Sequence, residues 1–200
     1  VLWVDAVLTW RGLPGSSGGL GSWVLEVGVA WDPILDLPVI PGSSVKGASR
    51  SFASEFFKGS PEGEELCEEL FGSPGGEGRV GALRFLDALP VGWEGRGLLS
   101  DDVVNAHYNP ELGEIRMELD VSPNPVLHLA LASGSVFRFA VGVDENSIDL
   151  SRFSGLPPEV GRDPTGLAAF LLGGALRMGL GSRSLRGYGV FRPIQAGVID

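Results

Sequence analysis

Two segments with apolar residues at helical spacing, separated by β-rich runs, limit the folds that this chain can adopt. The first, residues 45–56, follows a strand-like run over residues 1–10. The second, residues 163–179, lies between an alternating stretch at 125–143 and a final strand at 185–194. The order strand, helix, strands, helix, strand predicts an α+β fold with helices on one face of an antiparallel sheet. The ferredoxin-like arrangement, with insertions, is the leading candidate.

Capping residues predict where the two helices begin. Ser43 or Ser44 is expected to cap the first helix, because a serine hydroxyl can accept a hydrogen bond from a free backbone N–H of the first turn. Asp163, followed by Pro164, is expected to cap the last helix in the same way. The apolar stripe expected on the first helix is Val45, Ala48, Phe52 and Phe56.

The remaining elements follow from alternation and from turn residues. Ser133-Gly134 lies midway in the alternating stretch, which predicts a β-hairpin turning at that dipeptide. The side chains expected to point inward from it are Leu127, Leu129, Leu131, Phe137, Phe139 and Val141. The other expected elements are a short helix over 62–70, a strand over 79–90 and a long insertion over 91–124.

Length and composition set the class of protein. With 200 residues the chain can form a single domain, residues 1–200, and 31 glycines with 14 prolines predict many turns. No signal-peptide pattern and no apolar run long enough to span a bilayer occurs, which predicts a cytoplasmic protein without a membrane partner. Cys67 is the only cysteine, so an intrachain disulfide is excluded. A zinc site made of Cys and His is not expected either, because the chain has only this cysteine and two distant histidines. We therefore predict no metal and no other cofactor.

The charge of the chain is unevenly distributed. A net charge of −10 argues against a general nucleic-acid binder. However, five glutamates fall within residues 62–69, whereas residues 164–199 contain four arginines and no acidic residue. A chain of this kind can be acidic overall and still present a local basic surface.

The start of the first helix has the ingredients of an anion site. Lys46 and Arg50 lie in its first turns, although a helix N-terminus already carries partial positive charge. Free backbone N–H groups and the hydroxyls of Ser43 and Ser44 stand beside these cations. The segment lacks the spaced second glycine of the G-x-x-x-x-G-K-[ST] loop, which argues against nucleotide hydrolysis. A capped core helix with two solvated cations remains an equal alternative.

A glycine-rich segment over residues 178–191 is the second candidate. Its glycines would let the backbone approach a ligand closely, and its arginines suit bidentate contact with phosphate. The alternative is an ordinary glycine-rich turn between a helix and a strand. The candidate binding residues of this segment are Gly179, Gly181, Ser182, Arg183, Arg186 and Gly187, beside Gly189.

Catalytic groups are weakly indicated. His128 lies in a strand pattern and is expected to be structural. His107 lies near Asp101, Asp102, Asn105 and Tyr108, which could suit acid–base chemistry, although polar turn residues are common. Glu26, Asp32 and Asp36 precede the first helix and could bind a metal, but their spacing does not require one. We predict no catalytic residue.

Three motifs, in order, resemble those of the RAMP superfamily, the repeat-associated subunits of CRISPR effector complexes. They are "IPGSSVKGASRSFASEF" at 40–56, "LFGS" at 70–73 with a strand ending in "LDALP" at 86–90, and "GLGSRSLRGYGVF" at 179–191. The resemblance implies a ferredoxin-like (RRM-like) RAMP fold and binding of CRISPR RNA. It also suggests that Ser43, Ser44, Lys46 and Arg50 contact the RNA together with the glycine-rich segment.

Two further segments resemble the family of sixth subunits of type III-B (Cmr) complexes: "SDDVVNAHYNPE" at 100–111 and "SPNPVLHLALASGSVFRFAV" at 122–141. This resemblance implies a non-catalytic subunit, in antiviral defence, that holds the 3′ side of the crRNA and meets target RNA. Its expected neighbours are the RNA-cleaving backbone subunit, the first Cmr subunit and the small helical subunit. Asn105, His107 and Tyr108 are further candidates for contact with RNA or a neighbouring subunit.

Two alternatives remain open. RNA-cleaving relatives place an essential aspartate before the first motif, where this chain aligns Glu26 and has Asp32 farther along. A metal-dependent ribonuclease would use Asp32 or Glu26 with His107. An architectural cap would contact protein alone.

Overall fold

A computed structural model describes residues 1–15, 29–73, 79–95, 97–106, 124–153 and 155–199. The helices are α1 (Gly42–Phe56), α2 (Pro61–Phe71) and α3 (Pro164–Met178), with short 3₁₀ helices at Glu145–Ser147, Leu150–Arg152 and Ser184–Arg186. The strands are β1 (Leu2–Leu8), β2 (Trp31–Asp32), β3 (Leu37–Pro38), β4 (Leu83–Phe85), β5 (Leu89–Trp93), β6 (Leu99–Ala106), β7 (Asn124–Leu131), β8 (Ser135–Val143) and β9 (Phe191–Val198).

The central sheet is antiparallel and has the order β4-β8-β1-β9, with β5 also paired to β8. Val4 in the middle of β1 lies opposite Phe139 of β8 on one side and Ala196 of β9 on the other. We count β4 and β5 together as the predicted single strand over 79–90, so that β1, β4 with β5, β8 and β9 are the first to fourth strands. Across the sheet they lie in the order β9, β1, β8, β4 with β5, which is fourth, first, third, second. This is the ferredoxin-like order, so the predicted fold is confirmed.

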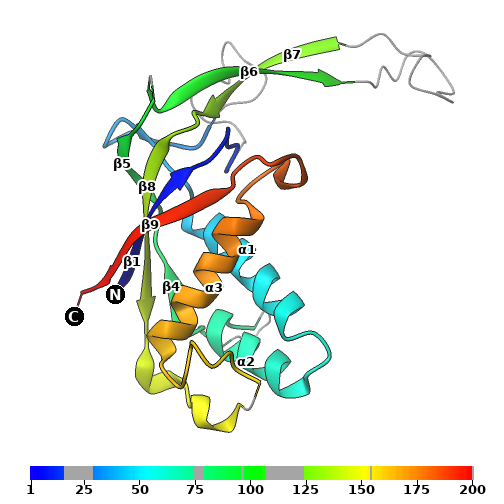
Figure 1. Cartoon of the computed structure of the whole chain (residues 1–200), viewed down its shortest axis with the longest axis vertical. Coiled ribbons are helices and arrows are strands. Elements are labelled where there is room, and N and C mark those ends of the chain that lie inside the picture. Colours follow the sequence, from blue (N-terminus) through cyan, green and yellow to red (C-terminus); the bar gives the residue numbers. More distant parts are fainter. Residues whose placement is uncertain (16–28, 74–78, 96, 107–123, 154, 200) are drawn as a thin grey trace, which may run out of the picture.

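Helices α1 and α3 pack against each other on one face of this sheet (Figure 1). Asp163 accepts hydrogen bonds from the backbone N–H groups of Thr165 and Gly166 at 3.0 and 2.9 Å, which confirms the predicted cap of α3. Gly174 of α3 leaves the space that the Phe52 ring of α1 fills. None of the described helices is long and apolar enough to cross a bilayer.

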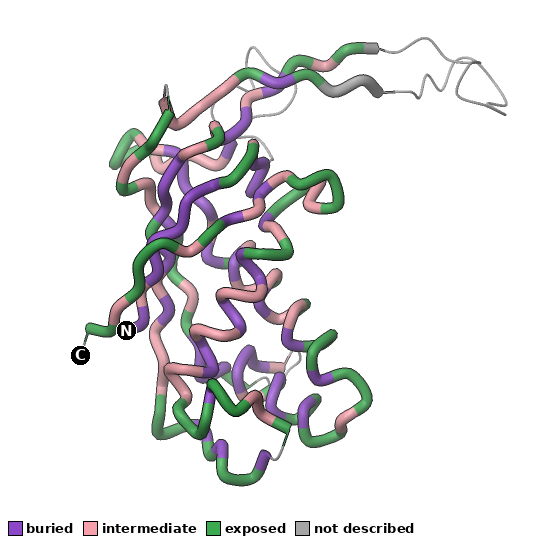
Figure 2. The backbone as a smooth tube through the Cα atoms, in the orientation of Figure 1, coloured by how far each residue is buried: buried purple, intermediate pink, exposed green. Residues whose placement is uncertain are grey.

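The buried residues follow the inner strands of the sheet and the facing sides of the helices (Figure 2). On α1 the predicted stripe is correct at Val45 but wrong at Phe56, which is 44% exposed. Ser49 and Ala53 are fully buried instead. The buried residues Val45, Ser49 and Ala53 recur every four residues and so share one side of the helix. Phe56 lies outside that side.

The predicted hairpin over 125–143 is wrong. Strand β7 pairs with β6 in a separate two-stranded ribbon, which extends away from the helices in Figure 1, while β8 pairs with β1, β4 and β5. Consequently Leu127 is 47% exposed, whereas His128 on the opposite side is buried. The turn after Leu131 moves the chain from one sheet to the other, and a local alternating pattern does not specify which partner strand is used.

Candidate nucleic-acid interface

The start of α1 is built by a contact between two distant motifs. Ile40 and Ala88 exchange backbone hydrogen bonds of 3.0 and 2.9 Å, which brings the segment after β4 beside the helix start. At Gly42 an added Cβ would lie 2.5 Å from the carbonyl oxygen of Phe85. A side chain cannot fit between these backbones, so glycine is required there.

Asp87 caps α1. Its Oδ1 accepts a hydrogen bond from the Gly42 N–H at 2.7 Å, and the helix has no cap from a hydroxyl side chain. The prediction that Ser43 or Ser44 caps the helix is therefore wrong. The pairing of Ile40 with Ala88 brings in a carboxylate, whose full negative charge suits a helix N-terminus better than a hydroxyl does. The anion at this helix start thus belongs to the chain itself.

Lys46 and Arg50 face a groove of about 550 Å³ beside α1. Arg79, which precedes β4, and Arg84, in the middle of β4, line the same groove. Arg84 also lines a second pocket, which contains Asp144. None of these four cations forms an ion pair with another described residue. The described lining is Lys46, Arg50, Phe71, Gly72, Ser73, Arg79, Val80, Gly81, Leu83, Arg84 and Phe85, and contains no acidic residue.

Sequence reasoning found two of these cations and missed the other two. Lys46 and Arg50 are four residues apart on one helix, a spacing that predicts a shared face. Arg79 and Arg84 join them only because α2 and the segment after it return the chain to α1. The sequence signal for Arg79 and Arg84 was that both lie within the second motif, between its "LFGS" and "LDALP" parts.

The floor of the groove is aromatic. Phe71, at the end of α2, is buried, and its ring stacks on that of Phe85 with centroids 5.9 Å apart and planes 10° from parallel. Phe85 is only half-buried. Leu83 also lines the groove but is 3% exposed, so Phe85 is the main aromatic surface there.

The glycine-rich segment packs mainly on its own chain. Gly181 pairs with Leu13, whose carbonyl oxygen would lie 2.5 Å from an added Cβ, and Gly179 would meet the carbonyl oxygen of Tyr188 at 2.8 Å. Gly187, with φ of +83°, has no atom within 4 Å of an added Cβ. At Gly179 and Gly181 the chain's own backbone takes the space beside the glycine, and contact of these residues with RNA stays a prediction.

The polar residues of this segment differ in exposure. Ser182 and Arg186 are exposed. Arg183 is half-buried, adopts a left-handed φ of 63°, and holds its guanidinium 5.9 Å from the Tyr188 ring centroid. None of these residues lines the groove beside α1.

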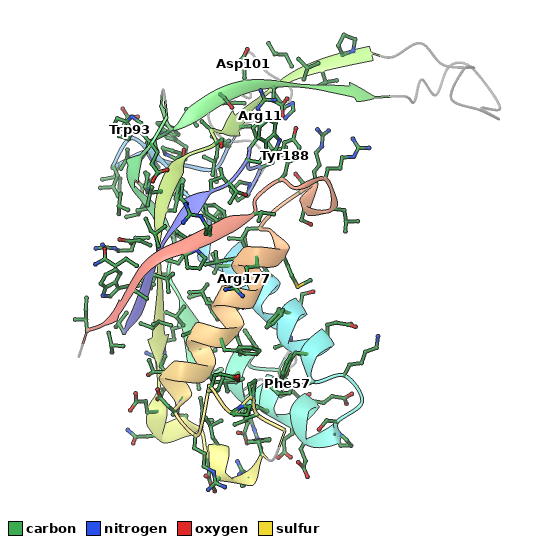
Figure 3. All side chains as sticks on the ribbon, in the orientation of Figure 1. Arg11, Phe57, Trp93, Asp101, Arg177 and Tyr188 are labelled. Carbon is green, nitrogen blue, oxygen red and sulfur yellow. The ribbon has the colours of Figure 1, made fainter. Side chains whose placement is uncertain are left out.

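Asp102 joins the glycine-rich segment to the base of the β6–β7 ribbon. Its carboxylate accepts hydrogen bonds from Arg11 at 2.6 Å and from the Tyr188 hydroxyl at 2.5 Å, residues labelled in Figure 3. Burial acts to raise the pKa of Asp102, but the hydrogen bonds from Tyr188 and the Val103 N–H, with the charge of Arg11, outweigh it and lower the pKa. The same hydrogen bond raises the pKa of Tyr188.

His128 lies directly opposite Asp102 across the ribbon, with its Nε2 3.6 Å from the carboxylate. It is 1% exposed, in agreement with the predicted structural role. Asp101 points to solvent. Asn105 pairs with Pro125 through the backbone of β6, and its side chain lies outside the described residues, as do His107 and Tyr108.

The carboxylates proposed for metal binding have other contacts. Asp32 accepts hydrogen bonds from the backbone N–H groups of Ile34 and Leu35 at 2.8 and 3.0 Å, and so closes the turn between β2 and β3. Asp36 accepts one from the Trp31 indole at 3.1 Å. Glu26 lies outside the described residues. Within the described ranges no three His, Cys, Asp or Glu side chains are grouped as metal ligands.

Comparisons with known proteins agree with this architecture. The chain is 32% identical over 181 residues to Cmr6, a subunit of the CRISPR Cmr system of Saccharolobus solfataricus, covering 90% of this chain and 54% of the relative. It thus spans about half the length of that relative. The sequence model of the RAMP superfamily matches residues 16–192 of this chain.

Two solved structures have the same fold. A chain in the cryo-EM structure of the type III-B Cmr-β complex bound to cognate target RNA is 31% identical, with a TM-score of 0.75 over 99% of this chain and 60% of that one. Cmr6 from Pyrococcus furiosus, at 18% identity, has a TM-score of 0.51 over 97% of this chain and 99% of that one, which supports the fold alone. From the match over residues 16–192, we conclude that the chain belongs to the RAMP superfamily.

Proposed function

We propose that this chain is a non-catalytic, guide-RNA-binding subunit of a type III-B (Cmr) CRISPR complex, and that the groove beside α1 holds RNA phosphates. The observation that carries the proposal is that Lys46, Arg50 and Arg79, with Arg84 at the edge, line one groove whose described lining has no acidic residue. The 32% identity to Cmr6 supports the choice of complex.

Contacts to phosphate suit a guide RNA. They hold the backbone without reading the bases, so guides of different sequence can use one site. Target specificity then comes from base pairing between guide and target. The capping of α1 by Asp87 is consistent with this role, because it compensates the helix N-terminus internally and leaves Lys46 and Arg50 for an external anion.

The net charge of −10 is compatible with RNA binding because the described lining of the groove contains no acidic residue. Glu64 and Glu68 line a neighbouring pocket, which they share with Arg50. The exposed acidic residues of α2 are Glu62, Glu64, Glu65 and Glu68. Charges more than about 10 Å apart are largely screened at ordinary ionic strength. A local groove of four cations can therefore attract phosphate on an acidic chain.

The non-catalytic role is supported at Asp32, one of the two carboxylates, with Glu26, that a ribonuclease would use. Its carboxylate accepts hydrogen bonds from two backbone N–H groups of its own turn. In the complex we expect the chain to hold the 3′ side of the crRNA and to meet target RNA. Its expected protein neighbours are the RNA-cleaving backbone subunit, the first Cmr subunit and the small helical subunit.

The double variant Lys46→Ala with Arg50→Ala tests the proposal in the assembled complex. If both cations contact phosphate, guide affinity falls, and the slope of log affinity against log salt becomes less negative by roughly 1.4. Lys58→Ala with Arg162→Ala removes the same charge from exposed positions outside the groove and should leave the slope unchanged. Equal slopes for wild type and the groove variant would overturn the proposal.

A further inference from the structure

The groove beside α1 combines a charged rim with an aromatic floor, and the two parts suit different parts of one ligand. Cations approach it from two sides, Lys46 and Arg50 from α1, and Arg79 and Arg84 from the chain leading through β4. The apolar side chains of the described lining are Phe71, Val80, Leu83 and Phe85. Phe71 and Leu83 are almost fully buried, so half-buried Phe85 supplies the aromatic floor. A site for phosphate alone does not need such a floor.

Phe85 is held in a fixed plane. The buried Phe71 ring stacks on one side of it, 5.9 Å away and 10° from parallel. Phe85 is half-buried and lines the groove, from which we infer that its ring is accessible there. A planar, rigidly held aromatic ring is the surface on which nucleobases stack, whatever their identity.

The size of the groove restricts the ligand. A volume of about 550 Å³ falls within the range of roughly 300–1,000 Å³ found for sites that bury small molecules, and suits a nucleotide. A base-paired helix would keep its bases stacked and away from Phe85. Bases can be splayed out onto an aromatic side chain when the RNA is single-stranded.

We propose that the groove binds one unstacked nucleotide of single-stranded RNA, with its base on Phe85 and its flanking phosphates on the four cations. This inference rests on the proposed RNA-binding function and adds a base-stacking subsite to it. The subsite would favour an unpaired nucleotide over a paired one without preference among the bases.

The purified chain can be tested by fluorescence anisotropy with a labelled ten-nucleotide oligouridylate and with the same oligonucleotide carrying abasic sites at all ten positions. Wild type should bind the intact probe at least about fivefold more tightly, the lower end of what base–aromatic stacking supplies. Phe85→Leu should remove this preference and keep the salt dependence. Phe85→Tyr should restore the preference, and thermal unfolding checks that both variants fold.

The outcomes separate the inference from the proposed function. If Phe85→Leu keeps the preference for the intact probe, the stacking subsite is wrong. If wild type binds both probes equally, and Lys46→Ala with Arg50→Ala weakens both, phosphate binding stands and the subsite is overturned. If wild type binds neither probe, both proposals fail. Displacement of the intact probe by uridine monophosphate at equal concentration would assign the groove to free nucleotides instead of RNA.

Discussion

Asp87 and Gly42, 45 residues apart in the chain, are joined by a 2.7 Å hydrogen bond from the Gly42 N–H to the Asp87 carboxylate. This bond caps α1, and it does so between two of the motifs by which the RAMP superfamily is recognised. The helix that carries Lys46 and Arg50 therefore depends for its start on the segment after β4.

Replacing Asp87 by alanine should destabilise the fold by about 1 kcal/mol, the usual cost of losing a helix cap. Asp87→Asn keeps an acceptor oxygen and should cost less. The free energy of unfolding, measured by urea titration, tests this. Asp101→Ala, which removes an exposed carboxylate from β6, is the matched control and should be close to neutral. Equal stability of the Asp87→Ala and Asp101→Ala variants would contradict the capping role.

Two glycines of α1 should respond to alanine in opposite directions. At Gly42 the added methyl group would lie 2.5 Å from the Phe85 carbonyl oxygen, so Gly42→Ala should cost about 1–3 kcal/mol. At Gly47 an added Cβ meets no atom within 4 Å, and alanine is the better helix former, so Gly47→Ala should stabilise by about 0.5–1 kcal/mol. Thermal or urea unfolding of both variants measures the difference, and the same sign for both would contradict the packing described.

The pair Tyr188 and Asp102 should make stability dependent on pH. The pKa of Asp102 is lowered in the fold, so its contribution is present above the ordinary aspartate pKa of about 3.9 and is lost as the pH falls through the folded-state pKa. Tyr188→Phe removes the hydroxyl donor and should cost about 1–3 kcal/mol at pH 7. The cost should shrink as the pH falls below about 3.9 and through the lowered folded-state pKa, because protonated Asp102 no longer needs that donor.

Urea unfolding of wild type and Tyr188→Phe across this pH range provides the test. Parallel stability curves would show that the hydrogen bond does not set the pKa of Asp102. Arg183→Ala removes the cation beside the Tyr188 ring without touching the carboxylate, and its cost should stay constant over the same range.

Asp32→Asn should leave target cleavage by the assembled complex unchanged. The amide keeps an oxygen acceptor for the N–H groups of Ile34 and Leu35, so the turn between β2 and β3 is preserved. A cleavage assay on complexes of confirmed composition measures the effect. Loss of cutting with intact assembly would instead favour the metal-dependent ribonuclease.

Much of the fold could be predicted because its signals are local. The apolar spacing predicted α1 and α3, Asp163 and Pro164 predicted the start of α3, and the element order predicted the ferredoxin-like sheet. The hairpin over 125–143 failed for a physical reason. Alternation determines which side chains share a face of a strand but not which strand lies beside it.

The sequence by itself determined the elements, their order and the pair of cations on α1, since each depends on residues within a few positions of one another. Only the tertiary structure decided that Asp87 caps this helix, that Arg79 and Arg84 complete the groove, and that Leu13 fills the space beside Gly181. These contacts join segments tens to more than a hundred residues apart. Their partners are set by the path of the folded chain, which no local spacing encodes.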